Sequence, residues 1–492
     1  MTATQSDGQA ARYPNLVGGA WREGGNGEWL EVRNPADRRE VVGLVPAMVP
    51  ADVDDAYRAA ADASVAWGAS SGIARGRVLL ETSRLLRDRR AEIARDLTRE
   101  MGKTLAEAQG EVDKSADFFE YYAGYGRFPQ GEVLAHERAG ARVWTVHEPV
   151  GVVLAITPWN DPLLTPARKV APALAAGNAV LLKGASYTPI VSHHLAKALF
   201  DAGLPKGVLA TVTGSTSVIG DALVEHEALK AVSFTGSNEV GDHLRQQLAG
   251  RSVKLLAELG GKNAAVVLAD ADLDAAVAAI SGAGFAQAGQ RCTATSRLIV
   301  DRKVAAELLD RLAAAASALV VGPGLDPGTV VGPLVADEQQ RVVAEYVAGV
   351  PGAVKVLAGG EIPPDPALSH GSYYAPTLLG SVSADMAVWR EEIFGPVIAA
   401  MEIEGLDEAI DVVNGSVYGL AAGVYTSSLD AADRFAREVN VGQVAINLPT
   451  SGWDVHMPFG GFKASGSGHK EQGAEALDFY TRVKTVASLG GR

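Results

Sequence analysis

Val150-Gly151-Val152-Val153-Leu154-Ala155-Ile156 is apolar along its whole length. An alternating strand has one polar face, whereas an uninterrupted apolar strand is typical of a parallel sheet that is buried on both faces. A helical pattern follows over residues 162–176, and a second apolar strand follows over residues 179–182. Strand and helix patterns that alternate in this way predict an α/β fold, with helices on both faces of a parallel sheet.

The alternation continues on the C-terminal side of this strand. It predicts helices over residues 189–202 and 217–225 and strands over residues 208–212 and 231–234. After Gly260-Gly261, a second series of strands and helices begins at Asn263 and extends to residues 441–447. We therefore expect a domain junction near residue 260.

On the N-terminal side the sequence predicts short strands over residues 13–45 and a layer of helices over residues 52–125. Residues 132–147 alternate around Ala139-Gly140, which indicates a hairpin that leaves the main body. Residues 485–489 form a further strand that could pair with this hairpin, in the same subunit or in another.

The composition excludes several classes of protein. A chain of 492 residues with 47% hydrophobic residues is long enough for two or three buried cores. Its formal net charge of −14 argues against nucleic acid as a partner. The N-terminal residues lack the pattern of a signal peptide, and no apolar run is long enough to span a membrane, so we expect a soluble cytoplasmic protein.

Cys292 is the only cysteine in the chain. A single thiol cannot form an internal disulfide or a multi-cysteine zinc site, and no metal site is expected. A nucleophile, a redox sensor or a buried apolar side chain remains. Gly289 permits unusual backbone geometry, Arg291 supplies positive charge, and the helical pattern over residues 272–288 stops just before the cysteine. These neighbours favour a loop that presents the thiol.

Two further residues follow predicted strands. Glu258 ends an apolar strand, and its carboxylate could be a general base with a pKa raised by burial, or could be paired with Lys254 or Lys262. Asn160 follows the strand that ends at Ile156, and its amide could help to form an oxyanion hole or an Asx turn.

The segment Phe234-Thr235-Gly236-Ser237-Asn238 joins a strand to a helix through a glycine. Backbone N–H groups at such a helix start can bind a pyrophosphate, and the Ser237 hydroxyl can add a contact. The sequence contains no G-x-G-x-x-G, so an ordinary tight connection explains the same residues.

In combination these motifs resemble the aldehyde dehydrogenase superfamily, from about Leu16 to Val486. The matching segments are Pro158-Trp159-Asn160, Phe234–Ser237, Glu258–Lys262, Gly289–Cys292, Glu391–Pro396 and Pro458–Lys463. The resemblance implies that Cys292 is the nucleophile, that Glu258 is the general base, and that Asn160 forms the oxyanion hole with the Cys292 backbone N–H. It places Lys183 and Glu392 on the ribose groups of a dinucleotide, with Thr157, Trp159, Gly236, Ser237 and Phe394 around it.

The same resemblance implies the domain organisation. A Rossmann-like dinucleotide-binding domain would comprise residues 1–127 and 149–259, and an α/β catalytic domain would comprise residues 260–470. Residues 128–148 and 471–492 would form a small β arm for oligomerisation, as a homodimer or homotetramer.

The implied chemistry is coherent with these roles. The thiolate attacks an aldehyde, the resulting oxyanion is stabilised, hydride leaves to the nicotinamide, and Glu258 activates the water that hydrolyses the thioester. A relative that transfers the acyl group to coenzyme A would not need this base. Glu258 therefore favours a carboxylic acid product.

The run Lys183-Gly184-Ala185-Ser186 departs from the family pattern, in which a glutamate often follows to bind the ribose of NAD. Ser186 removes the negative charge that would repel a 2′-phosphate, so we expect a preference for NADP, with NAD possible. Ser186 as a helix N-cap would be compatible with either cofactor.

The substrate residues point to a charged aldehyde. Arg168 matches a tunnel position where semialdehyde dehydrogenases have an arginine, although it could instead pair with Asp161, seven residues earlier. Arg291 is a possible second anchor or a member of an ion pair. The second arginine of the semialdehyde enzymes is replaced by Ala286. The segment around Ser451 and Trp453 resembles 2-oxoglutarate semialdehyde (2,5-dioxopentanoate) dehydrogenases, although Trp453 could be core packing.

We therefore expect oxidation of a small aldehyde, 2-oxoglutarate semialdehyde, to 2-oxoglutarate. Succinate semialdehyde, or a broad range of aldehydes, is the alternative substrate. A non-catalytic member of the fold would be possible but is disfavoured by the three intact residues Cys292, Glu258 and Asn160. A cysteine hydrolase is disfavoured because no histidine stands in a recognisable arrangement with the thiol.

Overall fold

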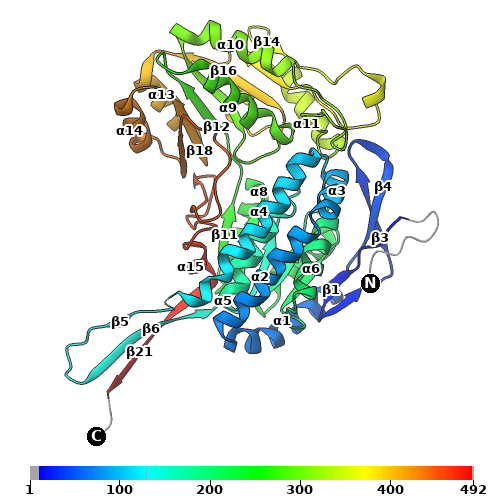
Figure 1. The fold of residues 1–492 in the computed structure, drawn as a ribbon, viewed down its shortest axis with the longest axis vertical. Coiled ribbons are helices and arrows are strands. Elements are labelled where there is room, and N and C mark those ends of the chain that lie inside the picture. Colours follow the sequence, from blue (N-terminus) through cyan, green and yellow to red (C-terminus); the bar gives the residue numbers. More distant parts are fainter. Residues whose placement is uncertain (1–9, 129, 490–492) are drawn as a thin grey trace.

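The computed structural model describes residues 10–128 and 130–489. Two α/β bodies lie one above the other, and a narrow β arm leaves the body that contains the N-terminal half of the chain (Figure 1). Each body is built on one sheet, and the chain passes from the first sheet to the second at Gly260-Gly261. The predicted α/β fold is confirmed.

The first sheet has five parallel strands in the order β11-β10-β7-β8-β9. Its strands are buried on both faces: Val152 and Leu154 of β7 pack on one side, and Val153 and Ala155 pack on the other. This explains why the strand is uninterruptedly apolar. The strands are β7 (Val152–Ile156), β8 (Ala179–Lys183), β9 (Leu209–Val212), β10 (Leu229–Thr235) and β11 (Lys254–Glu258).

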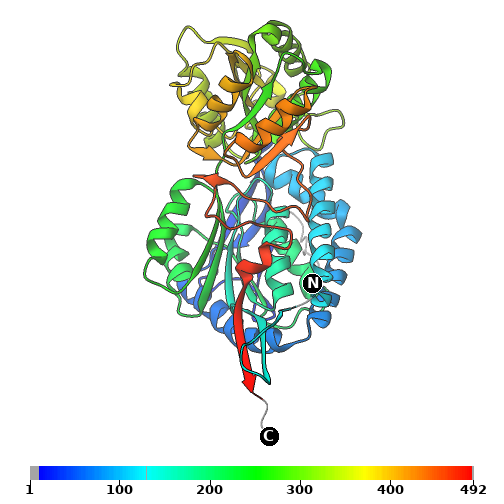
Figure 2. The ribbon, with the colours of Figure 1, turned by 90° about the vertical axis from the view of Figure 1, so that its left-hand side faces the viewer.

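Helices cover both faces of this sheet (Figure 2). One face packs against α1 (Pro50–Ala69), α7 (Thr216–Glu225) and α8 (Asn238–Leu248). The other face packs against α5 (Leu164–Ala176) and α6 (Ile190–Asp201), with α2 (Gly72–Asp88), α3 (Arg90–Met101) and α4 (Leu105–Ala123) outside them. Two small hairpins precede these helices: β1 (Asn15–Val17) with β2 (Ala20–Arg22), and β3 (Trp29–Asn34) with β4 (Asp37–Pro46).

The second sheet has seven strands in the order β14-β15-β16-β13-β12-β18-β19, and only β14 runs antiparallel to its neighbour. Its strands are β12 (Asn263–Val267), β13 (Thr295–Asp301), β14 (Lys355–Ala358), β15 (Thr377–Gly380), β16 (Val397–Ile403), β18 (Ala421–Tyr425) and β19 (Gln443–Ile446). The helices of this body are α9 (Leu273–Phe285), α10 (Arg302–Ser317), α11 (Asp337–Ala348), α12 (Ala387–Arg390), α13 (Gly405–Asn414) and α14 (Leu429–Glu438). Two short strands, β17 (Tyr418–Gly419) and β20 (Phe462–Lys463), pair with each other in an antiparallel ladder that is separate from this sheet.

The arm is a three-stranded antiparallel sheet in the order β21-β6-β5. Strand β21 (Thr481–Leu489) pairs along its whole length with β6 (Ala141–Pro149), which in turn pairs with β5 (Val133–Leu134). The expected pairing of residues 485–489 with the hairpin is thus present within one chain. Residues 471–480 do not extend outward: α15 (Ala476–Tyr480) packs against α5, so the chain leaves the body only at Thr481.

The helix that the sequence predicts over residues 272–288 ends earlier than expected. Helix α9 ends at Phe285, and a single 3-10 turn, η2 (Ala286–Gly289), follows. Gln287 and Ala288 have positive φ values of 50° and 54°, which turns the chain out of the helix before Cys292. No helix of the described residues is long and apolar enough to cross a membrane.

Candidate active site

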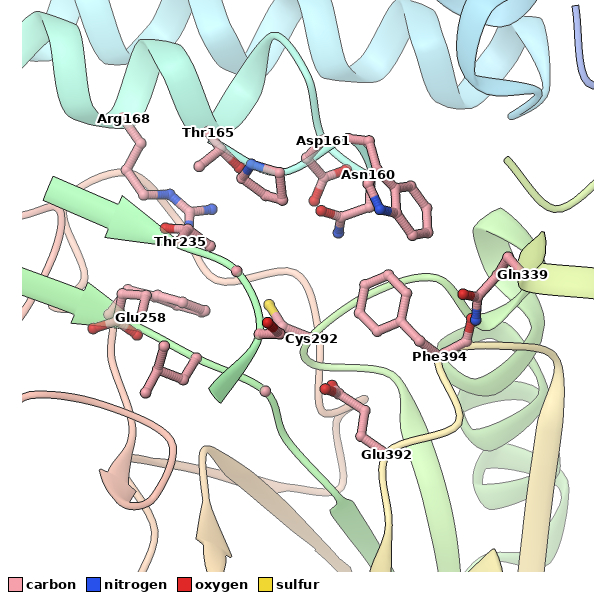
Figure 3. Close-up of a pocket in the computed structure, with 17 residues that line it drawn as sticks. Asn160, Asp161, Thr165, Arg168, Thr235, Glu258, Cys292, Gln339, Glu392 and Phe394 are labelled. Atoms are coloured by element: carbon pink, nitrogen blue, oxygen red, sulfur yellow. The ribbon is translucent and has the colours of Figure 1, made fainter. Parts of the chain in front are cut away.

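The carboxyl ends of three neighbouring strands of the first sheet form one wall of the site. Thr157 to Asn160 follow β7, Gly236 and Ser237 follow β10, and Glu258 is the last residue of β11. Parallel strands end at the same edge of a sheet, so these residues lie close together. Of them, Asn160 and Glu258 are seen around Cys292 of the second body (Figure 3). This edge is where α/β sheets bind ligands.

The thiol loop of the second body forms the opposite wall. Asn263, at the start of β12, donates its amide to the carbonyl oxygens of Cys292 at 2.7 Å and Ala294 at 2.9 Å. Gly289 has a φ of +69°, and a Cβ atom at this position would lie 2.1 Å from the carbonyl oxygen of Gly395. The loop that carries Cys292 therefore packs directly on the backbone next to Phe394.

One cavity of about 230 Å³ lies between these walls. Cys292 is at its centre, with Glu258 on one side and Phe394 and Gln339 on the other (Figure 3). The sequence-predicted residues that line it are Trp159, Asn160, Asp161, Arg168, Gly236, Ser237, Glu258, Cys292, Glu392 and Phe394. Residues from several distant stretches of the sequence, in both bodies, thus surround the thiol of Cys292.

A second cavity, of about 390 Å³, opens on the other side of Cys292. It is lined by the predicted substrate residues Arg291, Ser451 and Trp453. The two cavities share Asp161, Arg168, Cys292 and Phe459. Cys292 therefore lies in the shared lining of both cavities, so a reactant in either cavity is next to the same thiol.

Three predicted cofactor residues line neither cavity. The backbone N–H of Thr157 donates to the carbonyl oxygen of Lys183 at 3.1 Å, so these two residues lie together at the ends of β7 and β8. Burial lowers the pKa of Lys183 to about 8. Ser186 is exposed, and it is not a helix cap because α6 begins after Pro189.

Glu258 is buried and has no ion pair. Neither carboxylate oxygen has a hydrogen-bond partner among the described residues. Burial, and then the charge of Glu471, raise the pKa of Glu258 well above its usual value. The alternative in which Glu258 pairs with Lys254 or Lys262 is wrong: Lys254 donates to the backbone carbonyl oxygens of Asp478, Phe479 and Thr481, and Lys262 has no hydrogen-bond partner in the described part of the chain.

Burial also raises the pKa of the Cys292 thiol, to about 12. The positive charge of Arg168 opposes this shift, and the carboxylates of Asp161, Glu392 and Glu258 add to it. The thiol is thus protonated at neutral pH in this state of the site. A group that accepts its proton is required before it can act as a nucleophile.

Arg168 does not pair with Asp161. Its Nη1 lies 3.7 Å from Oε2 of Glu471, and its guanidinium lies 4.6 Å from the centre of the Phe459 ring. Asp161 instead lies 3.1 Å from Nζ of Lys103. The alternative of an Asp161–Arg168 pair is wrong because Asp161 precedes α5, which begins at Leu164, so the spacing of a helix does not apply to it.

Several residues of the site were not predicted. Lys169 forms a buried ion pair with Glu471 and donates to Ser233 at 3.0 Å. A lysine within the almost entirely apolar helix 164–176 was a signal that could have identified it. Gln339 lines the first cavity and donates to the carbonyl oxygens of Ile393 and Phe394. Nothing in the sequence pointed to this residue.

Sequence and structure comparisons agree with this geometry. The fold has two α/β bodies, and one cavity between them is lined by Cys292, the buried carboxylate of Glu258 and the amide of Asn160. The family model described as "Aldehyde dehydrogenase family" matches residues 21–486, and the chain belongs to this family.

The relatives found include semialdehyde dehydrogenases. The chain is 41% identical over 479 residues to an alpha-ketoglutarate semialdehyde dehydrogenase of Haloferax volcanii, covering 96% of this chain and 98% of that protein. It is 38% identical to an alpha-ketoglutaric semialdehyde dehydrogenase of Bacillus subtilis, covering 96% and 97%. Among solved structures, betaine aldehyde dehydrogenase of Staphylococcus aureus in complex with NAD+ superposes with a TM-score of 0.94 at 32% identity, covering 97% of this chain and 94% of that one.

Proposed function

We propose that this protein oxidises an aldehyde with a distal carboxylate to the acid, with a nicotinamide dinucleotide as oxidant, and that 2-oxoglutarate semialdehyde is its main substrate. The observation that carries the proposal is Cys292 in the shared lining of two cavities, with Arg168 in the lining of both and Arg291 in that of the second. The substrates named for the Haloferax and Bacillus relatives support the choice.

The residues of the first cavity fit a dinucleotide. The hydroxyl group of Thr235, which lines this cavity, is buried without a partner among the described residues, so it is available to a polar ligand. Burial raises the pKa of Glu392 to about 7, and such a carboxyl group gains from a hydroxyl partner. In this proposal Lys183 and Glu392 hold ribose groups, and Trp159, Gly236, Ser237 and Phe394 enclose the remainder. When bound, the nicotinamide supplies the acceptor for the hydride.

The chain's own residues then perform the covalent steps. The thiol proton of Cys292 passes through water to the carboxylate of Glu258, and the sulfur bonds to the carbonyl carbon. The Asn160 amide with the Cys292 backbone N–H stabilises the oxygen that becomes negative, and Glu258 releases the thiol proton to solvent before the thioester is hydrolysed. Glu258, with its raised pKa, accepts a proton from the water that attacks the thioester. A buried unpaired carboxyl group next to the thiol supports hydrolysis rather than transfer to coenzyme A.

The second cavity supports a charged substrate. Arg168 is only partly neutralised by Glu471 at 3.7 Å, and its Nε has no partner among the described residues. Arg291 lines the same cavity, as do Ser451 and Trp453. A guanidinium group binds a carboxylate through two parallel hydrogen bonds, so Arg168 and Arg291 are the proposed contacts of the distal carboxylate.

We propose NADP as the preferred dinucleotide because Ser186 is uncharged and exposed where a glutamate would repel a 2′-phosphate. The decisive assay measures kcat/KM for 2-oxoglutarate semialdehyde, succinate semialdehyde and propanal with both NADP and NAD. The highest value is expected for 2-oxoglutarate semialdehyde with NADP. A preference for propanal would overturn the substrate, and a preference for NAD would overturn the cofactor.

The variant Arg168→Leu tests the carboxylate anchor. It should raise KM for succinate semialdehyde about tenfold, because one charge-assisted hydrogen bond is lost, with little change in KM for propanal. Arg142→Leu, in the β arm, is the matched control. Equal effects on both aldehydes would show that Arg168 only supports the fold.

A further inference from the structure

The side chain of Gln287 connects the two loops that meet at the thiol. Its Nε2 donates to the carbonyl oxygen of Asn160 at 3.1 Å and to Oδ1 of Asp161 at 2.9 Å. Its Oε1 accepts a hydrogen bond from Nε of Arg291. A single amide, only 1% exposed, thus bonds both to the loop after β7 and to the residue that precedes Cys292.

The backbone of Gln287 is held as firmly as its side chain. Its N–H donates to Oε1 of Glu107 at 2.8 Å, and its carbonyl oxygen accepts from Nε2 of Gln290 at 3.0 Å. Gln287 and Ala288 both have left-handed φ values, 50° and 54°. Residues other than glycine keep such a conformation only when their surroundings enforce it, and such residues gather at functional sites.

The contacts of Gln287 continue into a buried group of charges. Asp161, which accepts from Gln287, lies 3.1 Å from Nζ of Lys103, and Lys103 also pairs with Glu111. Although burial on its own would raise it, the charges of Lys103 and Arg291 lower the pKa of Asp161 to about 2. Asp161 therefore remains a carboxylate, and its charge is committed to these partners rather than to Arg168.

This arrangement fixes the direction of Arg291. Its Nε is occupied by Gln287, so the remainder of the guanidinium group is left for the second cavity, which Arg291 lines. An arginine side chain has many rotamers, and one anchored nitrogen removes most of that freedom before a carboxylate arrives. The cost of binding a charged aldehyde is correspondingly lower.

We propose that Gln287 is a positioning residue with two effects. It keeps the Asn160 loop and the Cys292 loop at the spacing that the oxyanion requires, and it aims Arg291 at the distal carboxylate of the substrate. The second effect rests on the proposed function, whereas the first applies to any aldehyde.

The test compares Gln287→Met, which keeps the length of the side chain and removes its hydrogen bonds, with Gln340→Met. Gln340 is a partly buried glutamine of α11 that donates to Tyr373 at 2.7 Å and lines neither cavity. For Gln287→Met, kcat with propanal should fall about tenfold or more, because small displacements of reacting groups are costly. The ratio of kcat/KM for succinate semialdehyde over propanal should fall as well, by about tenfold. Gln340→Met should change neither quantity.

A double-mutant cycle separates the two effects. Arg291→Met should lower the selectivity ratio in the wild-type protein but should have no further effect on it in Gln287→Met, because Arg291 is then no longer aimed. If Arg291→Met leaves the ratio unchanged, recognition of the carboxylate by Arg291 fails, while kcat with propanal still decides the first effect. If Gln287→Met and Arg291→Met lower the selectivity ratio additively, the proposal that Gln287 orients Arg291 is overturned.

Wild-type kcat with propanal in Gln287→Met, or an equal loss in Gln340→Met, would overturn the first effect. If Gln287→Met does not fold, Gln287→Glu provides the same test. Glutamate keeps the size of the side chain and an acceptor for Arg291 but cannot donate to Asn160 or Asp161. Its kcat with propanal should again fall, and an unchanged kcat would refute the role.

Discussion

Glu258 shows how one residue can combine a cost to stability with a gain in chemistry. A buried carboxyl group without a partner is expensive to ionise, which is why its pKa is raised. Gly460 makes room for it, since a Cβ atom there would lie 2.5 Å from Oε1 of Glu258. The Glu258 side chain has no hydrogen-bond partner among the described residues, yet Gly460 leaves space for it. A catalytic role explains these two observations better than a structural role does.

The variant Glu258→Gln should therefore become more stable relative to the wild type as the pH rises. Above the usual pKa of glutamate the unfolded wild-type chain ionises, while the folded chain resists ionisation until its raised pKa is reached. Over that range the wild type loses stability, at about 1.4 kcal/mol for each unit by which the pKa is raised. Glutamine cannot ionise, so the difference in Tm between variant and wild type should grow by about 2 °C or more from acidic to alkaline pH.

Thermal melts at a series of pH values measure this difference. Glu361→Gln, the same substitution at an exposed glutamate, is the control with which the pH dependence of the Glu258→Gln difference is compared. The absolute Tm of Glu258→Gln is not diagnostic, since a buried amide without partners carries its own cost. A difference that is constant across the series would show that Glu258 ionises as freely in the folded protein as in the unfolded one.

At the scale of elements, the sequence predicted strands and helices that have a regular hydrophobic pattern, but it did not predict where a single turn ends a helix. The strand over Val150–Ile156 was predicted because burial on both faces leaves an uninterrupted apolar run. The end of α9 was not, because Gln287 and Ala288 leave the helix by left-handed angles that neither residue type favours. Helical spacing made a pair of Asp161 and Arg168 an alternative to substrate binding by Arg168, but only Arg168 lies on the helix.

The same limit applies to the candidate site. Cys292, Glu258 and Asn160 follow strands or glycines, so sequence position together with the family resemblance identified them. Gln287 and Lys169 act through contacts with residues more than a hundred positions away, and such contacts follow from the fold rather than from local pattern. Sequence reasoning named most of the polar groups that line the cavities, although not Gln339, and it missed Gln287 and Lys169, whose contacts support those groups.

The loop of Gly289 offers a test at this scale. Gly289→Ala should disrupt the packing of this loop on Gly395. The φ of residue 289 is +69°, and the new Cβ atom would lie 2.1 Å from the backbone oxygen of Gly395. We expect a loss of stability of about 2 kcal/mol or more and a loss of most dehydrogenase activity. Gly282→Ala is the matched control within α9: nothing lies within 4 Å of its Cβ position, and alanine favours a helix. Similar effects of the two substitutions would refute this account of the loop.

At the scale of the whole molecule, the site needs both bodies, because Glu258 and Asn160 come from the first sheet and Cys292 from the second. No described residue of β5, β6 or β21, the strands of the arm, lines either cavity. The arm projects away from the first body, and Val133 and Val483 on it are 89% and 60% exposed (Figure 1). Long strands with free edges and exposed apolar side chains pair readily with another chain. We therefore propose that the arm joins subunits.

Ending the chain after Arg482 tests this proposal, because it removes most of β21 while leaving α15 and both large sheets intact. The full-length protein should have a mass in solution that is a multiple of 51.1 kDa, and the shortened chain should be mostly monomeric by size-exclusion chromatography with light scattering. Retention of dehydrogenase activity in the monomer is expected, since the deleted residues that the structure describes line neither cavity. An unchanged oligomer after the deletion would place the subunit contact on the two bodies instead. A monomer without activity, but with an unchanged Tm, would show that the partner subunit stabilises the catalytic geometry.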